Sequence, residues 1–391
     1  MAICCCGPKD PGRQPRMPGC RSAEARLLEA LPASAGVRVE DTQVIGPDGG
    51  PAYVHSVELV GEAGAAGRPP LVFLPGYGTG AAIWCAAWRH WLDTGSPLAR
   101  RHLIAVDPLG WYLSSHPEWT PGLQPLLAEA WFVESLEAWR AARGFQRLDL
   151  LGHSIGGYLA ACYAERHPER IATLVLLSPA GIPKQPPDYQ ARLPEAPWKM
   201  RLLLRLWGRG YTPHLALRRV PRCTGYKVAF ATARRWLRGS GDVTALADYI
   251  YYGWTEGPQS GEQVLGAILH PGAWAKNALC MRIPKLSVPH VEFIYGDRDW
   301  MDFRHGNAVA AACRAAQGPA PRAWVQLVRR AGHYVHLENV PDFTAALARA
   351  LGRDVDGPEE RTAAVPEGFA ERFSGPNVPA WRGWEGYEFG R

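Results

Sequence analysis

The sequence predicts an α/β protein with a mostly parallel central sheet, helices on both faces of that sheet, and a helical cap inserted into it. Short apolar runs typical of buried strands alternate with stretches of helical apolar spacing, which is the pattern of a parallel sheet covered on both sides. This alternation breaks between residues 183 and 270, where the composition becomes basic and aromatic, and it returns afterwards. The chain has 391 residues, of which 47% are hydrophobic and 20% charged, values typical of a soluble globular protein.

The expected elements follow from local patterns taken in chain order. Alternation and β-branched residues predict a strand over 52–60, and a helix is expected over 125–144, where the apolar spacing is helical and a glycine ends the run. The segment 147–168 reads as a strand, a tight turn and a helix. Further buried strands are expected in LVFLPGYGTG and at 102–110, 171–181, 290–300 and 323–333.

The same patterns divide the chain into five parts. Residues 1–35 are expected to form a flexible tail with a short helix around Ala23–Leu31, and residues 353–391 a second flexible tail rich in Gly and Pro. The core is expected in two parts, 36–182 and 271–352. Residues 183–270, between them, should form the helical, basic cap. The sequence shows no internal repeat.

The strongest chemical motif is Gly152-His153-Ser154-Ile155-Gly156, which fits the pattern G-x-S-x-G. It lies between an expected strand and an expected helix, as the sharp turn that presents a nucleophilic serine requires. Gly152 and Gly156 leave room for the chain in that turn. A purely structural glycine turn is the alternative, and the strand-helix context disfavours it.

A nucleophilic serine on this kind of turn needs an acid and a histidine later in the chain. FIYGDRDWMD follows an expected strand and contains Asp297, Asp299 and Asp302; we expect Asp299 to be the acid, with Asp297 second, since either could instead cap the turn. His333 follows the last expected strand and is the expected base. His336 should be a packed or solvent-facing side chain, because no Cys, His or Asp set nearby supports a metal ligand.

Two backbone N–H groups should stabilise the oxyanion that forms when the serine attacks. One is that of Ile155, directly after the nucleophile. The other should come from PGYGTG, where we expect Tyr77 to supply it. No cofactor and no metal is expected.

At this point the chain resembles a known family, the α/β-hydrolase-domain-containing four/five group, which is related to the cardiolipin-specific deacylases. The group comprises lysophospholipase-like, lipase-coactivator and lysophosphatidate acyltransferase-like proteins. The resemblance covers roughly residues 50–351 and implies an α/β-hydrolase fold and action on phospholipids, lysophospholipids or triacylglycerol at membranes or lipid droplets. It rests on GHSIGGYLAA, HPERIATLVLLSPAG, VDPLGWYLSSHPEW, WFVESLEAWR, FIYGDRDWMD and GHYVHLEN.

The chain departs from the group at three places. Pro75 replaces a histidine that usually precedes the glycine of the oxyanion loop. Tyr112 and Leu113 occupy a loop that is usually smaller, so a bulkier pocket wall or a displaced loop is expected. The acyltransferase-associated pattern H-x-x-x-x-D appears here as His333 to Glu338.

Three functions therefore compete. The first is a serine hydrolase of acyl esters in phospholipids, lysophospholipids or neutral glycerolipids. The second is a 1-acylglycerol-3-phosphate acyltransferase, with acyl-CoA as a further partner and with His333 and Glu338 as its motif. The third is a non-catalytic lipase coactivator. Ser154 favours an enzyme, and H-x-x-x-x-E favours hydrolysis, with Glu338 acting only near the N-terminus of the last helix.

Charge points to a membrane rather than to nucleic acid as the partner. Residues 191–240 contain twelve Lys or Arg and one acid, a net charge of +11, interleaved with aromatic residues. That combination suits an anionic membrane surface, and no nucleic-acid-binding signature accompanies it. The expected membrane-facing residues of the cap are Arg218, Arg219, Arg234 and Arg235.

The cysteines and the chain start suggest the compartment. Nine cysteines without metal-ligand spacing are typical of reduced thiols in an intracellular protein, and neither a secretory pattern nor a bilayer-spanning apolar run is present. We expect a cytoplasmic protein, peripheral on membranes or lipid droplets, with the mitochondrion as an open alternative. Cys4, Cys5 and Cys6 are candidates for S-acylation, against an unmodified tail.

Overall fold

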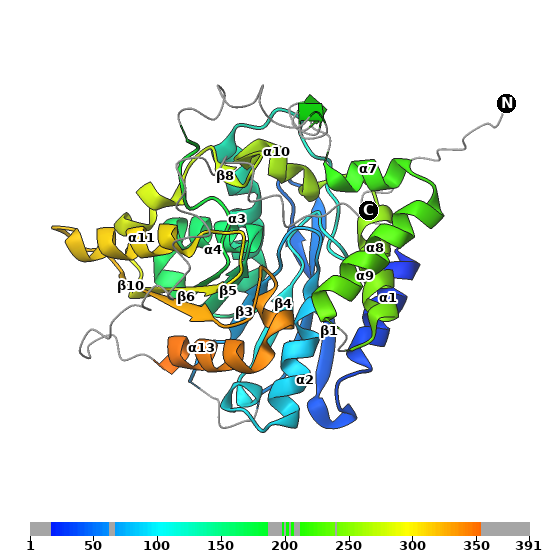
Figure 1. Cartoon of the computed structure of the whole chain (residues 1–391), viewed down its shortest axis with the longest axis horizontal. Coiled ribbons are helices and arrows are strands. Elements are labelled where there is room, and N and C mark those ends of the chain that lie inside the picture. The colour runs from blue at the N-terminus through cyan, green and yellow to red at the C-terminus, as the bar shows by residue number, and fades with distance from the viewer. Residues whose placement is uncertain are drawn as a thin grey trace.

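An eight-stranded, mostly parallel sheet forms the centre of the computed structural model of the chain (Figure 1). The structure describes residues 17–61, 67–186, 198, 201–202, 205–206, 212–238 and 241–352. The predictions for Cys4, Cys5 and Cys6 and for the tail 353–391 lie outside the described residues, as does part of the expected cap. Within the described ranges, no helix is long and apolar enough to cross a membrane.

The strand order is β1-β2-β4-β3-β5-β6-β9-β10. β1 pairs antiparallel with β2, and β2 antiparallel with β4, whereas the pairs from β4 to β10 are parallel. Every residue of β3, β4, β5 and β9 is buried, as expected for strands covered on both faces. The strand bounds are Val37–Ile45 (β1), Pro51–Leu59 (β2), Leu71–Leu74 (β3), Leu103–Val106 (β4), Leu148–His153 (β5), Ile171–Leu177 (β6), His290–Gly296 (β9) and Arg322–Val328 (β10).

Helices cover both faces of the sheet, as predicted. α2 (Cys85–Asp93) and α13 (Val340–Gly352) lie on one face, and α3 (Pro125–Ala142), α4 (Ile155–Arg166) and α11 (Phe303–Ala315) on the other (Figure 1). α13 shows why such helices dock. Its buried side chains recur at helical spacing and form one apolar stripe: Phe343, Ala346, Leu347 and Ala350.

The cap is helical, as predicted, in the part that the structure describes. It contains α7 (Pro213–Arg219), α8 (Arg222–Leu237), α9 (Val243–Thr255) and the short α10 (Val264–Ile268). Thr212 and Asp242 cap α7 and α9 by accepting from backbone N–H groups in their first turns. A short hairpin of β7 (Leu269–His270) and β8 (Trp274–Ala275) returns the chain toward the sheet. α8 packs against α9 through small buried residues that permit a close approach, Gly225, Ala229 and Ala233.

The N-terminal segment contains a helix, as expected, but this helix packs against the cap, which corrects the prediction of a flexible tail for residues 18–28. α1 spans Pro18–Leu28, begins earlier than the helix expected around Ala23–Leu31, and lies beside α9 (Figure 1). The Glu256 carboxylate accepts from the N–H groups of Gly19 and Cys20, at 3.2 and 3.0 Å. A Cβ at Gly19 would lie 2.5 Å from the Tyr252 ring, so only glycine permits this contact. Residues 18–28 therefore belong to the folded unit.

The turns that follow the parallel strands meet at one edge of the sheet. The carboxyl ends of β3, β5, β6, β9 and β10 lie next to one another. The register pairs near these ends are Leu74 with Gly152, Leu177 with Ile294, and Gly296 with Val328. In open α/β sheets this carboxyl edge is where ligands bind. The predicted nucleophile, acid and base all follow these strands directly.

Candidate active site

Ser154 occupies the sharp turn between β5 and α4, as predicted. Its φ of 55° and ψ of −117° are strained for a residue with a side chain, which is characteristic of a nucleophile elbow. A Cβ on Gly152 would lie 2.2 Å from the Gly156 carbonyl oxygen, and one on Gly156 would lie 2.5 Å from that of Pro75. Both glycines are therefore required by close approaches of the backbone.

Asp299 and His333 are brought together. The Nδ1 atom of His333 lies 3.0 Å from Oδ1 of Asp299, and the Asp299 side chain is fully buried. Asp297 instead accepts from the Ala331 N–H at 3.2 Å, so it ties the acid turn to the loop after β10. Asp302 caps α11 and pairs with Arg304. Of the three candidate acids, Asp299 is the one that contacts the histidine.

The elbow and the loop that carries His333 are in direct contact. Nε2–H of His153 donates to the His333 carbonyl oxygen at 2.9 Å, and the two imidazole rings lie 4.9 Å apart. Burial, together with the neighbouring His336 and His333, lowers the pKa of His153 well below its ordinary value. A neutral His153 therefore joins the turn that carries Ser154 to the loop that carries His333.

His336 is packed, as predicted. It is fully buried, and its ring lies 4.3 Å from that of Trp84 at an angle of 31°. Neither ring nitrogen has a hydrogen-bond partner among the described residues. Burial lowers the pKa of His336 to about 3, so the imidazole is neutral and packs as an aromatic ring in the core.

The loop after β3 passes directly over Ser154. A Cβ on Gly76 would lie 2.6 Å from Nδ1 of His153 and 3.3 Å from the Ser154 Cβ. Within the described part of the chain, the backbone N–H groups of Tyr77 and Ile155 have no hydrogen-bond acceptor. These two N–H groups, the donors that the sequence predicts for an oxyanion, therefore lie unpaired, among the described residues, in the turns that flank Ser154.

The bulky residue Tyr112 supports this loop. Its hydroxyl donates to the Gly78 carbonyl at 2.6 Å, and the indole N–H of Trp254 in α9 donates to the same oxygen at 2.7 Å. The Tyr112 ring fills the space above Gly80 and Gly253, where an added Cβ would lie 2.5 and 2.2 Å from it. Tyr112, expected to make a bulkier pocket wall, therefore connects the loop after β3 to helix α9 of the cap.

Comparison with known proteins identifies the family. Residues 69–340 match the family described as alpha/beta hydrolase fold. The chain belongs to the α/β-hydrolase family.

Within that family the chain falls in the ABHD5-like group. It is 32% identical over 328 residues to a probable 1-acylglycerol-3-phosphate O-acyltransferase of Oryza sativa subsp. japonica, covering 82% of this chain and 75% of the relative. It is 30% identical over 285 residues to 1-acylglycerol-3-phosphate O-acyltransferase ABHD5 of Homo sapiens, covering 71% and 75%. These relatives confirm the resemblance seen in the sequence motifs.

Solved structures support the fold at lower identity. Carboxylesterase CesB of Bacillus subtilis matches with a TM-score of 0.55 and 18% identity, covering 86% of this chain and 98% of that one. A membrane phospholipase A described as a bacterial virulence factor matches with a TM-score of 0.54 and 21% identity, covering 86% and 92%. Both similarities concern the α/β-hydrolase fold.

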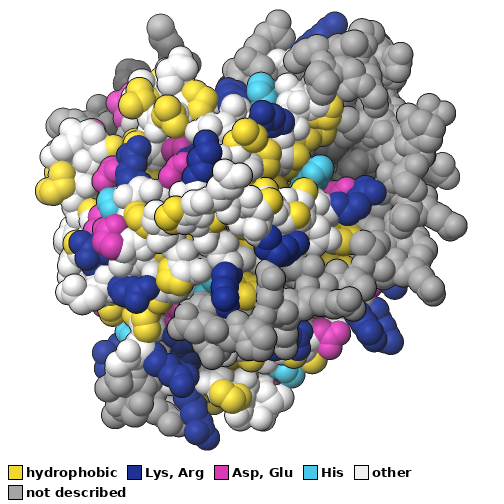
Figure 2. All heavy atoms as spheres, turned by 90° about the vertical axis from the view of Figure 1, so that its left-hand side faces the viewer, with side chains coloured by type: hydrophobic (Ala, Val, Ile, Leu, Met, Phe, Trp, Pro, Cys, Tyr) yellow, Lys and Arg dark blue, Asp and Glu magenta, His cyan; other side chains and the backbone are white. Residues whose placement is uncertain are grey.

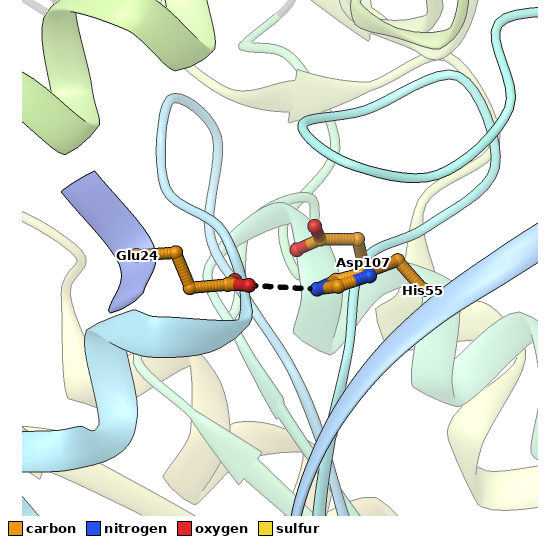
Figure 3. A group of neighbouring side chains, drawn as sticks. All are labelled: Glu24, His55 and Asp107. Carbon is orange, nitrogen blue, oxygen red and sulfur yellow. Dashed lines mark hydrogen bonds and ion pairs between the residues drawn. The ribbon is translucent and has the colours of Figure 1, made fainter. Parts of the chain in front are cut away.

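Three ionisable side chains, Glu24, His55 and Asp107, form a buried network in this α/β hydrolase (Figure 3). His55 on β2 is fully buried, with Nδ1 2.6 Å from Asp41 and Nε2 3.0 Å from Glu24 on α1. Burial by itself would lower the pKa of His55, but the adjacent Glu24 and Asp41 carboxylates raise it to about 10. Asp107, after β4, accepts from the N–H groups of Ala81 and Leu113, at 2.6 and 3.0 Å. It thereby fixes the end of the oxyanion loop.

The same three side chains present atoms within 4.8 Å of one another that could hold a metal ion: Glu24, His55 and Asp107. Their contacts fit a protonated His55 better, because each ring nitrogen lies at hydrogen-bonding distance from a carboxylate and donates a proton to it. Sequence reasoning missed this network. Its one signal was Asp107 at the end of an apolar strand.

Four arginines of the cap were predicted to face a membrane, and for one of them, Arg218, the prediction is wrong. Arg218 is mostly buried; its Nη1 lies 3.1 Å from Glu262, and its Nε donates to the Trp254 carbonyl at 3.0 Å. It therefore joins α7 to α9 and to the segment after it. Arg219, Arg234 and Arg235 are exposed. Pro213 starts α7 beside the site, and His214 contacts the Tyr77 hydroxyl through Nδ1.

Proposed function

We propose that this protein is a serine hydrolase that cleaves acyl esters of phospholipids, lysophospholipids or neutral glycerolipids through an acyl-enzyme. The observation that carries the proposal is the hydrogen bond between Asp299 and His333, placed at the same sheet edge as the strained Ser154. An acid, a base and an elbow serine in this chain order are the catalytic set of the α/β-hydrolase fold.

The chemistry follows from that arrangement. Nδ1–H of His333 donates to Asp299, which leaves Nε2 free to accept the proton of the Ser154 hydroxyl as Oγ attacks the ester carbonyl carbon. The N–H groups of Tyr77 and Ile155 donate to the oxyanion. His333 then gives the proton to the departing alcohol oxygen. A water molecule, activated by the same base, releases the fatty acid and regenerates Ser154.

A membrane surface is the proposed place of action. Exposed apolar side chains at Val220, Val228 and Phe230 accompany the exposed arginines of α7 and α8. Basic and apolar side chains together suit the headgroup region of an anionic bilayer. Lys and Arg side chains are also spread over the face that carries α11, between apolar and acidic ones (Figure 2). We assign the membrane contact to the cap because exposed arginines and exposed apolar residues occur together on α7 and α8 and just after α7. S-acylation of the N-terminal cysteines would add to membrane binding.

Acyl transfer to a lysophosphatidate hydroxyl is the second candidate. It is favoured by relatives at about 30% identity that are named 1-acylglycerol-3-phosphate O-acyltransferases. The two reactions differ in the acceptor that attacks the acyl-enzyme, and acyl-CoA is the additional donor for transfer. A non-catalytic coactivator is the third candidate, and the intact Ser154, Asp299 and His333 argue against it.

One experiment separates the candidates. Purified protein is incubated with labelled phospholipid or triacylglycerol, with and without acyl-CoA and lysophosphatidate, and the products are resolved. Hydrolysis predicts free fatty acid in all arms, abolished by Ser154→Ala. Transfer predicts labelled phosphatidate only when lysophosphatidate is present. No product in any arm, with the folded state confirmed, would favour the coactivator.

A further inference from the structure

The carboxylate of Glu338 accepts from the backbone N–H groups of the two residues that flank His333, Gly332 and Tyr334. Its Oε2 accepts from the Gly332 N–H at 3.0 Å, and its Oε1 accepts from the Tyr334 N–H at 3.1 Å. A Cβ on Gly332 would lie 3.0 Å from the same carboxylate, so the carboxylate packs closely against this residue. The side chain is largely buried, and the carboxylate thus fixes the backbone from which the imidazole projects.

Glu338 is not the carboxylate that pairs with the imidazole. Nδ1 of His333 is already occupied by Asp299, whereas Glu338 contacts only backbone N–H groups of that loop. Glu338 also ends α12 (Val335–Glu338) and precedes α13. Glu338 was expected to act only near the N-terminus of the last helix, but its carboxylate instead accepts from the loop that carries His333.

The cap reaches the same loop through the end of α8. Arg238 has a left-handed backbone with φ of 47°, pairs with Glu338 through Nη2, and donates from Nη1 to the Arg330 carbonyl at 2.9 Å. Two residues earlier, the Trp236 ring stacks on Tyr334 at 3.9 Å and 30°. The C-terminal end of α8 therefore contacts the chain just before and just after His333.

These contacts form a path from the cap to the catalytic base. Proton transfer requires Nε2 of His333 to lie within hydrogen-bond reach of Ser154, and displacements on the order of 1 Å lower turnover steeply. The Arg238–Glu338 pair is partly exposed, so it is individually weak and is screened by salt. If α8 shifted when the cap bound a membrane surface, Arg238 would separate from Glu338. The Glu338 carboxylate would then be less firmly fixed against the N–H groups of Gly332 and Tyr334.

We propose that Glu338 is a positioning residue for His333, and that Arg238 and Trp236 make its hold on the base depend on the placement of the cap. The inference rests on the proposed hydrolase function. Glu338 acts through the backbone of the loop and touches neither the substrate nor the reacting atoms.

The test compares Glu338→Gln with Asp342→Asn, which removes the same charge four residues along at an exposed position. The amide introduced by Glu338→Gln keeps one acceptor oxygen and turns a donor toward the other N–H, so the loop loses one of its two anchors. With a small soluble ester, Glu338→Gln should lower kcat about ten- to a hundredfold at unchanged KM, and Asp342→Asn should not. The acid limb of the pH profile should shift to lower pH only in Glu338→Gln, because a carboxylate near the imidazolium is removed.

A second variant tests the link to the cap. Arg238→Gln leaves both Glu338 hydrogen bonds to the loop intact, and should lower kcat about two- to tenfold on the soluble ester. Wild-type kcat and pH profile in Glu338→Gln would overturn the positioning role, and wild-type kcat in Arg238→Gln would overturn the link. A loss confined to phosphatidate synthesis, with hydrolysis retained, would overturn the inference in favour of a transfer motif. Wild-type protein that neither hydrolyses the ester nor reacts with a fluorophosphonate at Ser154 would instead overturn the proposed function.

Discussion

His333 Nδ1 lies 3.0 Å from Oδ1 of Asp299, whereas Asp297, two residues earlier, is turned to the backbone N–H of Ala331. One short turn therefore contains two acids with separate tasks. In the proposed mechanism Asp299 orients the imidazole of His333 and stabilises its protonated form. Asp297 joins the same turn to the loop that carries His333.

This division predicts unequal effects of two conservative substitutions. Asp299→Asn should lower kcat/KM by roughly a thousand- to ten-thousandfold, because an amide favours the wrong imidazole tautomer. Asp297→Asn keeps an acceptor oxygen for the Ala331 N–H and should cost less than about tenfold. Steady-state kinetics on a soluble ester measures both. If both variants lost the same activity, or if Asp297→Asn lost more, the assignment of Asp299 as the catalytic acid would be wrong.

The buried His55 predicts a pH-dependent stability. The pKa of His55 in the folded protein, about 10, is above the unfolded value of about 6.5. Its contribution is therefore fully present below about pH 6.5 and is lost as pH rises through about 10. We expect the free energy of unfolding by urea to fall by on the order of a few kcal/mol between these values. In His55→Gln the free energy of unfolding should be lower at every pH and should change less with pH. If the free energy of unfolding of the wild-type protein depended on pH as weakly as that of the variant, the proposed ion network would be wrong.

Exposed and buried arginines of the cap should differ in their effect on vesicle binding. Replacing Arg219, Arg234 and Arg235 together by Gln should weaken partitioning onto anionic vesicles on the order of a hundredfold at low salt, since each basic residue contributes about 1 kcal/mol. Activity on a soluble ester should remain. Vesicle co-sedimentation across a salt series provides the measurement.

Arg218→Gln is the matched control for that experiment, because Arg218 pairs with Glu262 inside the cap. It should lower the melting temperature and leave vesicle binding in place. If wild-type protein bound neutral and anionic vesicles equally at every salt concentration, the exposed arginines would be an ordinary solvated surface.

The parts of the fold that follow from local pattern could be predicted. The elbow is readable because the glycines on both sides of Ser154 are required by backbone contacts within the turn and with the neighbouring strand. The acid and the base are readable because parallel strands end at one edge, so the residues that follow them meet there. The choice of Asp299 over Asp297 agrees with the contact that Asp299 makes with the histidine.

The features that the sequence did not reveal depend on long-range partners. Docking of α1 needs Glu256 from the far end of α9, and the role of Arg218 needs Glu262. The position of Glu338 in the chain indicates a helix end, but its carboxylate turns back to the loop that carries the base. Spacing along the chain does not specify which of several nearby donors a carboxylate meets.

The central claim, that Ser154 carries an acyl group during turnover, is tested most directly by rapid quenching with a labelled acyl ester and mass spectrometry of the peptides. The account predicts a covalent acyl adduct on the peptide containing Ser154 in wild-type protein, accompanied by release of fatty acid. It predicts neither in Ser154→Ala at an unchanged melting temperature, because the hydroxyl contributes chemistry rather than packing. Release of fatty acid by Ser154→Ala at the wild-type rate would contradict it.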